Sequence, residues 1–145
     1  ALRNLVAQCR PGSPVLFLEM DIPAAITHPD VPLVSEMRDL IVAAFRANGV
    51  SPAPGLDLRA HFLAAGLGEP RLLYLGRFDP APAFGNCMAI ASVLRSLLPI
   101  IEAEGLATAD ELQLDTLPDR LASALSAQNA QIMNPPLVAA LGYAG

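Results

Sequence analysis

The sequence comprises 145 residues, of which 53% are hydrophobic and 16% are charged, and its formal net charge is −5. This length is enough for one domain with a substantial core, and the composition excludes an intrinsically disordered chain. Lysine is absent, so nine arginines supply all of the basic side chains. An acidic chain of this kind lacks the basic surface that would bind nucleic acids or anionic membranes. We therefore expect neither as a partner.

The sequence carries no recognisable targeting segment, and no uninterrupted apolar run reaches the roughly 20 residues that a transmembrane helix needs. The two cysteines, Cys9 and Cys87, do not amount to a disulfide framework. Buried free thiols in a reducing compartment are favoured over a bridge between them. The chain opens at Ala1 without an initiator methionine, which is typical of a mature piece or a fragment. We expect a cytoplasmic protein.

In chain order, residues 1–8 predict the last turns of a helix, and a turn rich in proline and glycine follows at residues 11–14. Val15–Met20 is a mostly apolar run of strand length. A strand that is apolar on both faces is typical of the centre of a parallel sheet with helices on both sides. Residues 24–30 are expected to form a loop.

Apolar side chains at helical spacing predict helices at residues 33–48 and 56–65, each ending beside a glycine. Arg71–Phe78 has the composition of a strand. The longest helical pattern covers Phe84–Glu104, and Pro99 within it is expected to kink or split the helix.

Thr108 and Glu111 have the spacing of a capping box, which predicts a short helix to about residue 113. Thr116 is predicted to cap a further helix that runs to about residue 128. Residues 132–133 and 137–143 predict a closing extended segment, interrupted by two prolines. This order of elements predicts an α/β or α+β fold with few strands and long helical insertions.

Local catalytic motifs are sparse: the sequence holds no glycine-rich phosphate loop, no zinc-protease motif, no serine-nucleophile turn and no metal-ligand cluster. Glu19 and Asp21 lie where the apolar strand ends, and their spacing of two puts both carboxylates on one side of an extended chain. Ligands bind outside this end of the strands in open α/β sheets. The alternative is that Asp21 caps a turn and Glu19 is a solvated strand end.

The two histidines are far apart in the sequence. His61 lies beside Phe62 in a predicted helix, where a structural role is favoured over a catalytic one. His28 lies in a predicted loop beside Pro29, where a solvated or capping role is favoured. His28 is nevertheless a candidate pocket residue.

A turn at Arg10-Pro11-Gly12 leads into the strand Val15–Met20, with Glu19 and Asp21 at its end. In this order and spacing, the segment resembles the turn, the fifth strand and the following acidic step of class I S-adenosylmethionine-dependent methyltransferases. Ser13 replaces the second glycine that is usual in the family's turn.

The resemblance continues along most of the chain. Ala65-Gly66-Leu67 resembles the end of the family's next helix, and Arg71–Leu75 resembles its sixth strand. Residues 95–121 resemble a helical tail insertion found in members that act on small molecules, and Pro135–Val138 resembles the final strand. The family's cofactor-binding half, with its glycine-rich turn and ribose-binding acidic residue, has no counterpart here. Leu141–Ala144 stands where the family usually has tryptophan, alanine and arginine.

The resemblance implies the C-terminal part of a Rossmann-like methyltransferase sheet, of about three strands, with a helical insertion or lid. It implies a single partial domain, with a sheet part at residues 1–83, a helical insertion at 84–130 and a closing strand at 131–145. It also implies S-adenosylmethionine as the cofactor, bound mainly outside this chain, and a small-molecule substrate near Glu19, Asp21 and His28.

The implied function is that of the C-terminal half of a methyltransferase, inactive without its N-terminal half. That half is supplied by another polypeptide, by a second copy of the chain or by residues removed from this sequence. An apolar strand without a neighbour on one edge also favours a missing partner. Two alternatives remain open. One is a non-catalytic methyltransferase-like module for dimerisation or partner binding, and the other is a small carrier whose helical lid encloses an apolar ligand.

Overall fold

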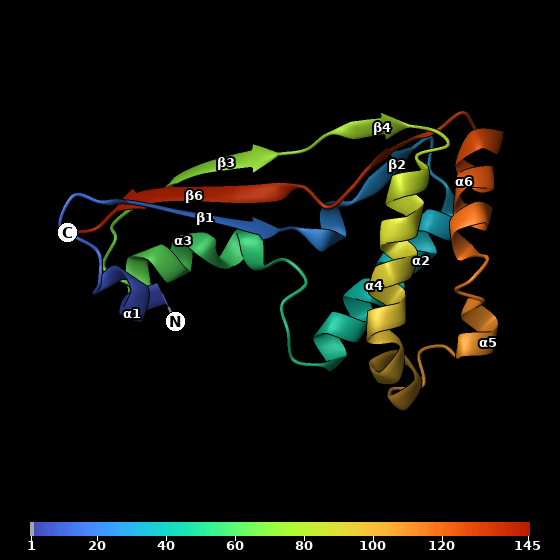
Figure 1. The fold of residues 1–145 in the computed structure, drawn as a ribbon, viewed down its shortest axis with the longest axis horizontal. Helices are drawn as coiled ribbons and strands as arrows, with labels where there is room; N and C mark the ends of the chain where they lie inside the picture. The colour runs from blue at the N-terminus through green and yellow to red at the C-terminus, as the bar shows by residue number, and fades with distance from the viewer. Residues whose placement is uncertain (1) are drawn as a thin grey trace. The chain divides into compact units, whose positions relative to one another are not determined.

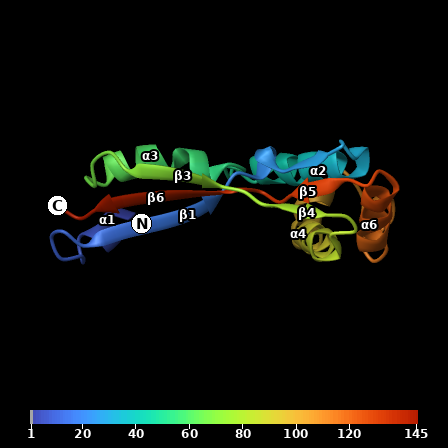
Figure 2. The same ribbon diagram turned by 90° about the horizontal axis from the view of Figure 1, so that it is seen from above.

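The computed structural model describes residues 2–145, which group into two compact units (Figures 1 and 2). Unit 1 comprises the described part of residues 1–21 together with 53–76 and 136–145, and unit 2 comprises residues 22–52 and 77–135. The mixture of helices and strands is confirmed. Because the chain passes between the units four times, the units do not follow the divisions expected after residues 83 and 130.

Unit 1 is a three-stranded sheet, here called sheet A, with two helices. The strands lie in the order β1 (Pro14–Met20), β6 (Leu137–Tyr143) and β3 (Arg71–Leu75), and the helices are α1 (Leu2–Val6) and α3 (Pro54–Ala64). β6 runs antiparallel to both neighbours, so β1 and β3 run parallel to each other.

The core of unit 1 lies between sheet A and α3. Leu58 and Phe62 are four residues apart, so both lie on the face of α3 that packs on the sheet, and both are buried. They pack with side chains from alternate positions of the strands, such as Val15 and Val138. The rings of Phe17 and Phe62 meet edge to face, with 6.2 Å between their centroids.

The strand predicted at Val15–Met20 is confirmed, but its predicted surroundings are wrong. β1 lies at the edge of sheet A, pairs antiparallel with β6, and has one covered face. On its other face Leu16, Leu18 and Met20 are 57%, 47% and 48% exposed. Apolar residues on both faces conceal the alternation that normally reveals a strand covered on one side. The sequence therefore predicts that both faces of β1 are covered, whereas unit 1 covers one of them.

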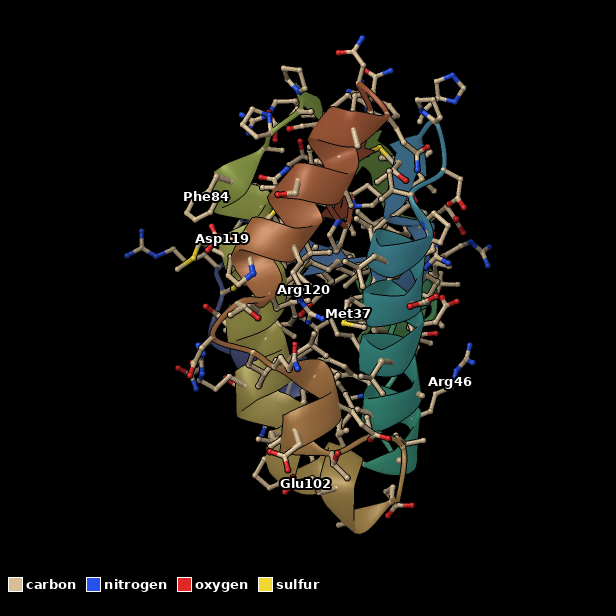
Figure 3. All side chains as sticks on the ribbon, turned by 90° about the vertical axis from the view of Figure 1, so that its right-hand side faces the viewer. Met37, Arg46, Phe84, Glu102, Asp119 and Arg120 are labelled. Atoms are coloured by element: carbon tan, nitrogen blue, oxygen red, sulfur yellow. The ribbon has the colours of Figure 1, made fainter. Side chains whose placement is uncertain are left out.

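Unit 2 packs helices and a small antiparallel sheet around one core. Its helices are η1 (Ile22–Ala24), α2 (Pro32–Ala47), α4 (Phe84–Ala103), α5 (Ala109–Leu112) and α6 (Leu117–Ala127). Its sheet has the order β2 (Ile26–His28), β5 (Gln131–Met133) and β4 (Phe78–Pro80). Figure 3 shows Met37 and Arg120 in the space between α2 and α6, whereas Arg46 points away from α2.

The long predicted helices are confirmed to within two residues at each end, as α2, α3 and α4. α4 is not split at Pro99 but continues to Ala103. Proline removes one backbone hydrogen bond to the preceding turn. Because only about one turn of α4 lies beyond Pro99, that loss does not divide the helix.

Two predictions about strands are wrong. Residues 24–30, expected to be a loop, contain β2, which is too short at three residues to show a periodic pattern. The single strand expected at Arg71–Phe78 is two strands, β3 and β4, which belong to different sheets. Gly76 and Arg77 separate them, and an isolated glycine inside a strand pattern is typical of such a break.

The capping box is confirmed, because the Thr108 amide donates to Glu111 Oε2 at 2.8 Å and Thr108 Oγ1 accepts from the Glu111 amide at 3.3 Å. Thr116 is the N-cap residue of α6, as predicted, but its side chain makes no capping hydrogen bond. Thr116 directly precedes α6, but its hydroxyl donates to the Gln113 carbonyl at 3.2 Å. Its φ of −99° and ψ of −8° are near-helical rather than the extended backbone that caps use.

Within residues 2–145, α4 is the one helix long and apolar enough to cross a membrane, by length and composition alone. The sequence prediction of no such segment counted uninterrupted apolar residues, and charged residues interrupt α4. Core helices of soluble proteins meet the same criterion. α4 buries four side chains in the core of unit 2, namely Cys87, Ala91, Leu94 and Ile101.

We predict that Gly55→Ala lowers the stability of the chain. A Cβ at Gly55 would lie 2.6 Å from Val138 Cγ2 and 2.9 Å from the Glu19 carbonyl oxygen, so α3 would have to move away from sheet A. Overpacking of this kind costs about 1–3 kcal/mol of unfolding free energy. Urea denaturation followed by circular dichroism measures the change, since the chain lacks tryptophan.

Gly85→Ala is the matched control, because a Cβ at Gly85 in α4 would meet nothing within 4 Å. In a helix, alanine is favoured over glycine by up to about 1 kcal/mol, so this variant should be as stable as the parent or more stable. Equal losses in both variants would contradict the close packing at Gly55.

Candidate functional site

The predicted carboxylates lie at the end of β1 in unit 1. The strand register aligns Glu19 of β1, Val138 of β6 and Tyr74 of β3 across sheet A, so their side chains share one face. Asp21 follows two residues after Glu19, and its amide donates to the Pro136 carbonyl at 3.0 Å, which continues the ladder. The expected arrangement of two carboxylates on one side of the chain is therefore present.

Asp21 is buried, with 6% of its surface exposed, and is paired with a phenol. The Tyr74 hydroxyl donates to Asp21 Oδ2 at 2.9 Å. Loss of hydration at the hydroxyl raises the pKa of Tyr74, and the hydrogen bond to Asp21 and the charge of that carboxylate raise it further. In the alternative interpretation Asp21 caps a turn, but the partner of its side chain is instead Tyr74, 53 residues away in the sequence.

Glu19 lines a hollow of about 280 Å³ on the side of sheet A that carries α3. His61 of α3 lines the same hollow, although the sequence favoured a structural role for it. His61 follows the buried Leu58 by three residues, which places it one turn further along the same side of the helix. This spacing is the signal that could have identified His61. A carboxylate and an imidazole in one hollow can bind a hydroxyl or amine group and exchange a proton with it.

His28 belongs to unit 2. It is exposed at the end of β2, where its register partner is Gln131 of β5. The proposed grouping of His28 with Glu19 and Asp21 therefore stays a prediction.

The turn after β1 does not fit a cradle for S-adenosylmethionine. The turn after β1 is Asp21-Ile22-Pro23, which has no glycine that would let the backbone approach a ligand closely. Within residues 2–145, no group of three or more His, Cys, Asp and Glu side chains could hold a metal ion.

Both cysteines are free thiols, as predicted, but of the two only Cys87 is buried and Cys9 is half-buried. Burial raises the pKa of the Cys87 thiol. A nucleophilic cysteine needs the opposite shift, so Cys87 has the character of a packed core residue.

No protein-family model and no curated protein matches the sequence.

We predict that Tyr74→Phe lowers the free energy of unfolding by about 1 kcal/mol near neutral pH. This value is below the roughly 1.5–3 kcal/mol of a hydrogen bond to a charged group, because Tyr74 is 53% exposed and solvent screens the interaction. The pKa of Tyr74 is higher in the folded chain than in the unfolded chain, so the contribution is present below pH 10 and is lost as the pH rises through the folded pKa. Urea denaturation at several pH values measures both effects.

Tyr143→Phe is the control, because Tyr143 is 58% exposed at the end of β6 and the chain has only these two tyrosines. That variant should keep the parental stability. In it, the absorbance change of phenolate ionisation reports Tyr74 alone. A midpoint at or below pH 10 would rule out the shift that Asp21 is expected to cause.

Proposed function

We propose that this chain is the C-terminal, substrate-side part of an S-adenosylmethionine-dependent methyltransferase that acts on a small molecule. In this proposal the half that binds the cofactor lies outside these 145 residues, either in a further stretch of the same polypeptide or in another chain. The observation that carries the proposal is that sheet A has an open apolar face across its three strands and that β1 has a free edge.

The order of elements supports the resemblance. The turn at Arg10–Gly12 precedes β1, residues 65–67 end α3, β3 follows, and α4 to α6 form the helical insertion. The resemblance implies that the final strand lies beside the first strand of this segment. β6 is that final strand, and it pairs with β1 over its whole length.

The open face of sheet A is apolar across all three strands. Side chains alternate along a strand, so the register identifies the positions that point away from α3. Arg71 is the one charged residue among them. The others are Pro14, Leu16, Leu18 and Met20 of β1, Leu73 and Leu75 of β3, and Leu137, Ala139, Leu141 and Tyr143 of β6.

A contiguous apolar surface of this kind marks a place where another polypeptide packs. Several of its members are strongly exposed: Leu73 by 45%, Leu75 by 49% and Tyr143 by 58%. In a doubly covered α/β sheet, this face would be covered by helices. Unit 1 supplies helices to the opposite face alone, which is why we assign the missing layer to further polypeptide.

The free edge of β1 supports the same conclusion. The Asp21 amide bonds to Pro136 and the Ala144 amide bonds to Ser13, so the odd-numbered residues of β1 face β6. Hydrogen-bonded and non-bonded positions alternate in an antiparallel ladder. The amides of Leu16, Leu18 and Met20 therefore point to the free edge, where a further strand would pair with them.

In this function, the end of β1 would position the substrate. Methyl transfer is a displacement that depends mainly on orientation and on exclusion of water. Glu19 and His61 line a hollow where a hydroxyl or amine would find both a carboxylate and an imidazole. Asp21, held by Tyr74, is a positioning residue that fixes the shape of the strand end.

We predict that the chain alone self-associates as its concentration rises, because water-exposed apolar surface is unfavourable. Leu18→Lys should reduce this association, since it puts a charge on the open face and at the free edge. Leu63→Lys is the matched control: Leu63 is 43% exposed and Leu18 is 47% exposed, but Leu63 lies on α3. Sedimentation velocity measures the effect. A monomer at high concentration with a cooperative melt would contradict the open face as an interface.

We further predict that calorimetric titration of S-adenosylmethionine into the chain alone shows no stoichiometric binding. Tight binding to the isolated chain would mean that the cofactor site is complete in these residues.

Coding sequence upstream of Ala1 discriminates between the candidate functions. A glycine-rich strand-turn-helix there favours the enzyme, and a native start near Ala1 favours a non-catalytic dimerisation or partner-binding module.

A further inference from the structure

Unit 2 contains a cavity of about 50 Å³ that lies outside the strand end described above. Its walls come from the η1–β2 segment, α2, α4 and β5, and they are predominantly aliphatic. Five isoleucines line it, namely Ile22, Ile26, Ile41, Ile90 and Ile132. Ile26 is 43% exposed, so the cavity reaches the surface beside it.

Most of the polar groups in the cavity wall already have protein partners. Thr27 Oγ1 accepts from the Val31 amide at 2.8 Å. The Ser35 hydroxyl donates to Asp30 Oδ1, also at 2.8 Å. Neither side chain needs a ligand to satisfy it.

Arg38 is the one charged residue in the wall, and its guanidinium is occupied. It donates to the Ala25 carbonyl at 3.0 Å and forms an ion pair of 2.8 Å with Asp39. Asn134 differs, because within residues 2–145 no protein group hydrogen-bonds its side chain. The cavity therefore offers one free neutral amide beside an apolar wall.

Size and polarity together define what fits. By this measure a buried water occupies roughly 10–15 Å³ and needs two to four polar partners. Among the polar side chains of the cavity wall, only Asn134 lacks a hydrogen bond to the described part of the chain. An apolar cavity of about 150 Å³ holds benzene. The cavity of unit 2 has about one third of that volume, which suits a branched alkyl group of about three carbon atoms.

We propose that this cavity binds the end of a small molecule that carries an isopropyl-type group next to a neutral amide or hydroxyl. The alkyl group fills the isoleucine-lined space, and the polar group pairs with the Asn134 amide. The remainder of the ligand extends past Ile26 into solvent. The inference concerns unit 2 alone and does not depend on methyl transfer.

The isoleucines themselves provide the test. The sequence has seven isoleucines, and the two that do not line the cavity, Ile100 and Ile101, lie further along α4. In a chain labelled at the isoleucine δ1 methyl carbons, isobutyramide should shift the five cavity signals saturably at millimolar concentrations. The signals of Ile100 and Ile101 should stay in place. Acetamide, which lacks the isopropyl group, should shift none of them.

Three variants, one of them a control, link the shifts to the cavity. Ala25→Leu adds a side chain to the wall and should weaken isobutyramide binding at least tenfold. Ala24→Leu is the matched control, because Ala24 is the adjacent residue and does not line the cavity. It should retain the parental affinity within about twofold. Asn134→Ala removes the free amide and should weaken binding about fivefold, the value expected for one neutral hydrogen bond.

Unchanged methyl signals, equal shifts of all seven isoleucines or unsaturable shifts would overturn the proposal. Equal affinity in Ala25→Leu and Ala24→Leu would do the same. If Ala25→Leu does not keep the parental Ile100 and Ile101 signals, Asn134→Ala decides instead. An unchanged affinity in Asn134→Ala would overturn the proposal, because the polar group of the ligand would then not pair with the Asn134 amide. Tighter binding of isobutyrate than of isobutyramide would contradict a neutral site and indicate Arg38 as the anchor.

Discussion

β6 is the strand on which unit 1 depends. It forms seven register pairs with β1 and five with β3, and neither of those strands has another neighbour in sheet A. The last strand of the chain therefore joins segments that are distant in sequence, and its long loops must close before any of these contacts form. The strand end depends on the same pairing, because Asp21 bonds to Pro136 and the register aligns Tyr74 and Glu19 on either side of Val138.

The helices were predictable from the sequence, and the sheets were not. Helical periodicity is local, and α2, α3 and α4 each bury a face with that spacing. Strand pairing is a property of distant segments. The parallel centre expected for β1 is instead an antiparallel edge, since its pairing depends on β6, about 120 residues later. The three-residue β2 and β4 exist only because β5 lies between them.

The candidate site shows the same division between local and distant information. The spacing of Glu19 and Asp21 was enough to place both on one side of the chain. Tyr74 could not be assigned to Asp21 without the register of β3 on β6. His61 reaches the hollow beside Glu19 because α3 lies very close to sheet A, which the absence of a side chain at Gly55 permits. The composition of the sequence and the spacing of its residues do not predict how closely α3 approaches sheet A.

The apolar side chains of the chain lie in more than one kind of environment. Phe62, Leu94 and Leu121 are fully buried in the cores, as a hydrophobic fraction of 53% leads one to expect. Leu16, Leu18 and their neighbours on the open face of sheet A belong to the same fraction but remain in contact with water. The isoleucine-lined cavity of unit 2 is a third environment, in a core whose buried residues are predominantly aliphatic. Hydrophobic composition measures the area that must leave water, and it does not say whether the same chain, a partner or a ligand covers that area.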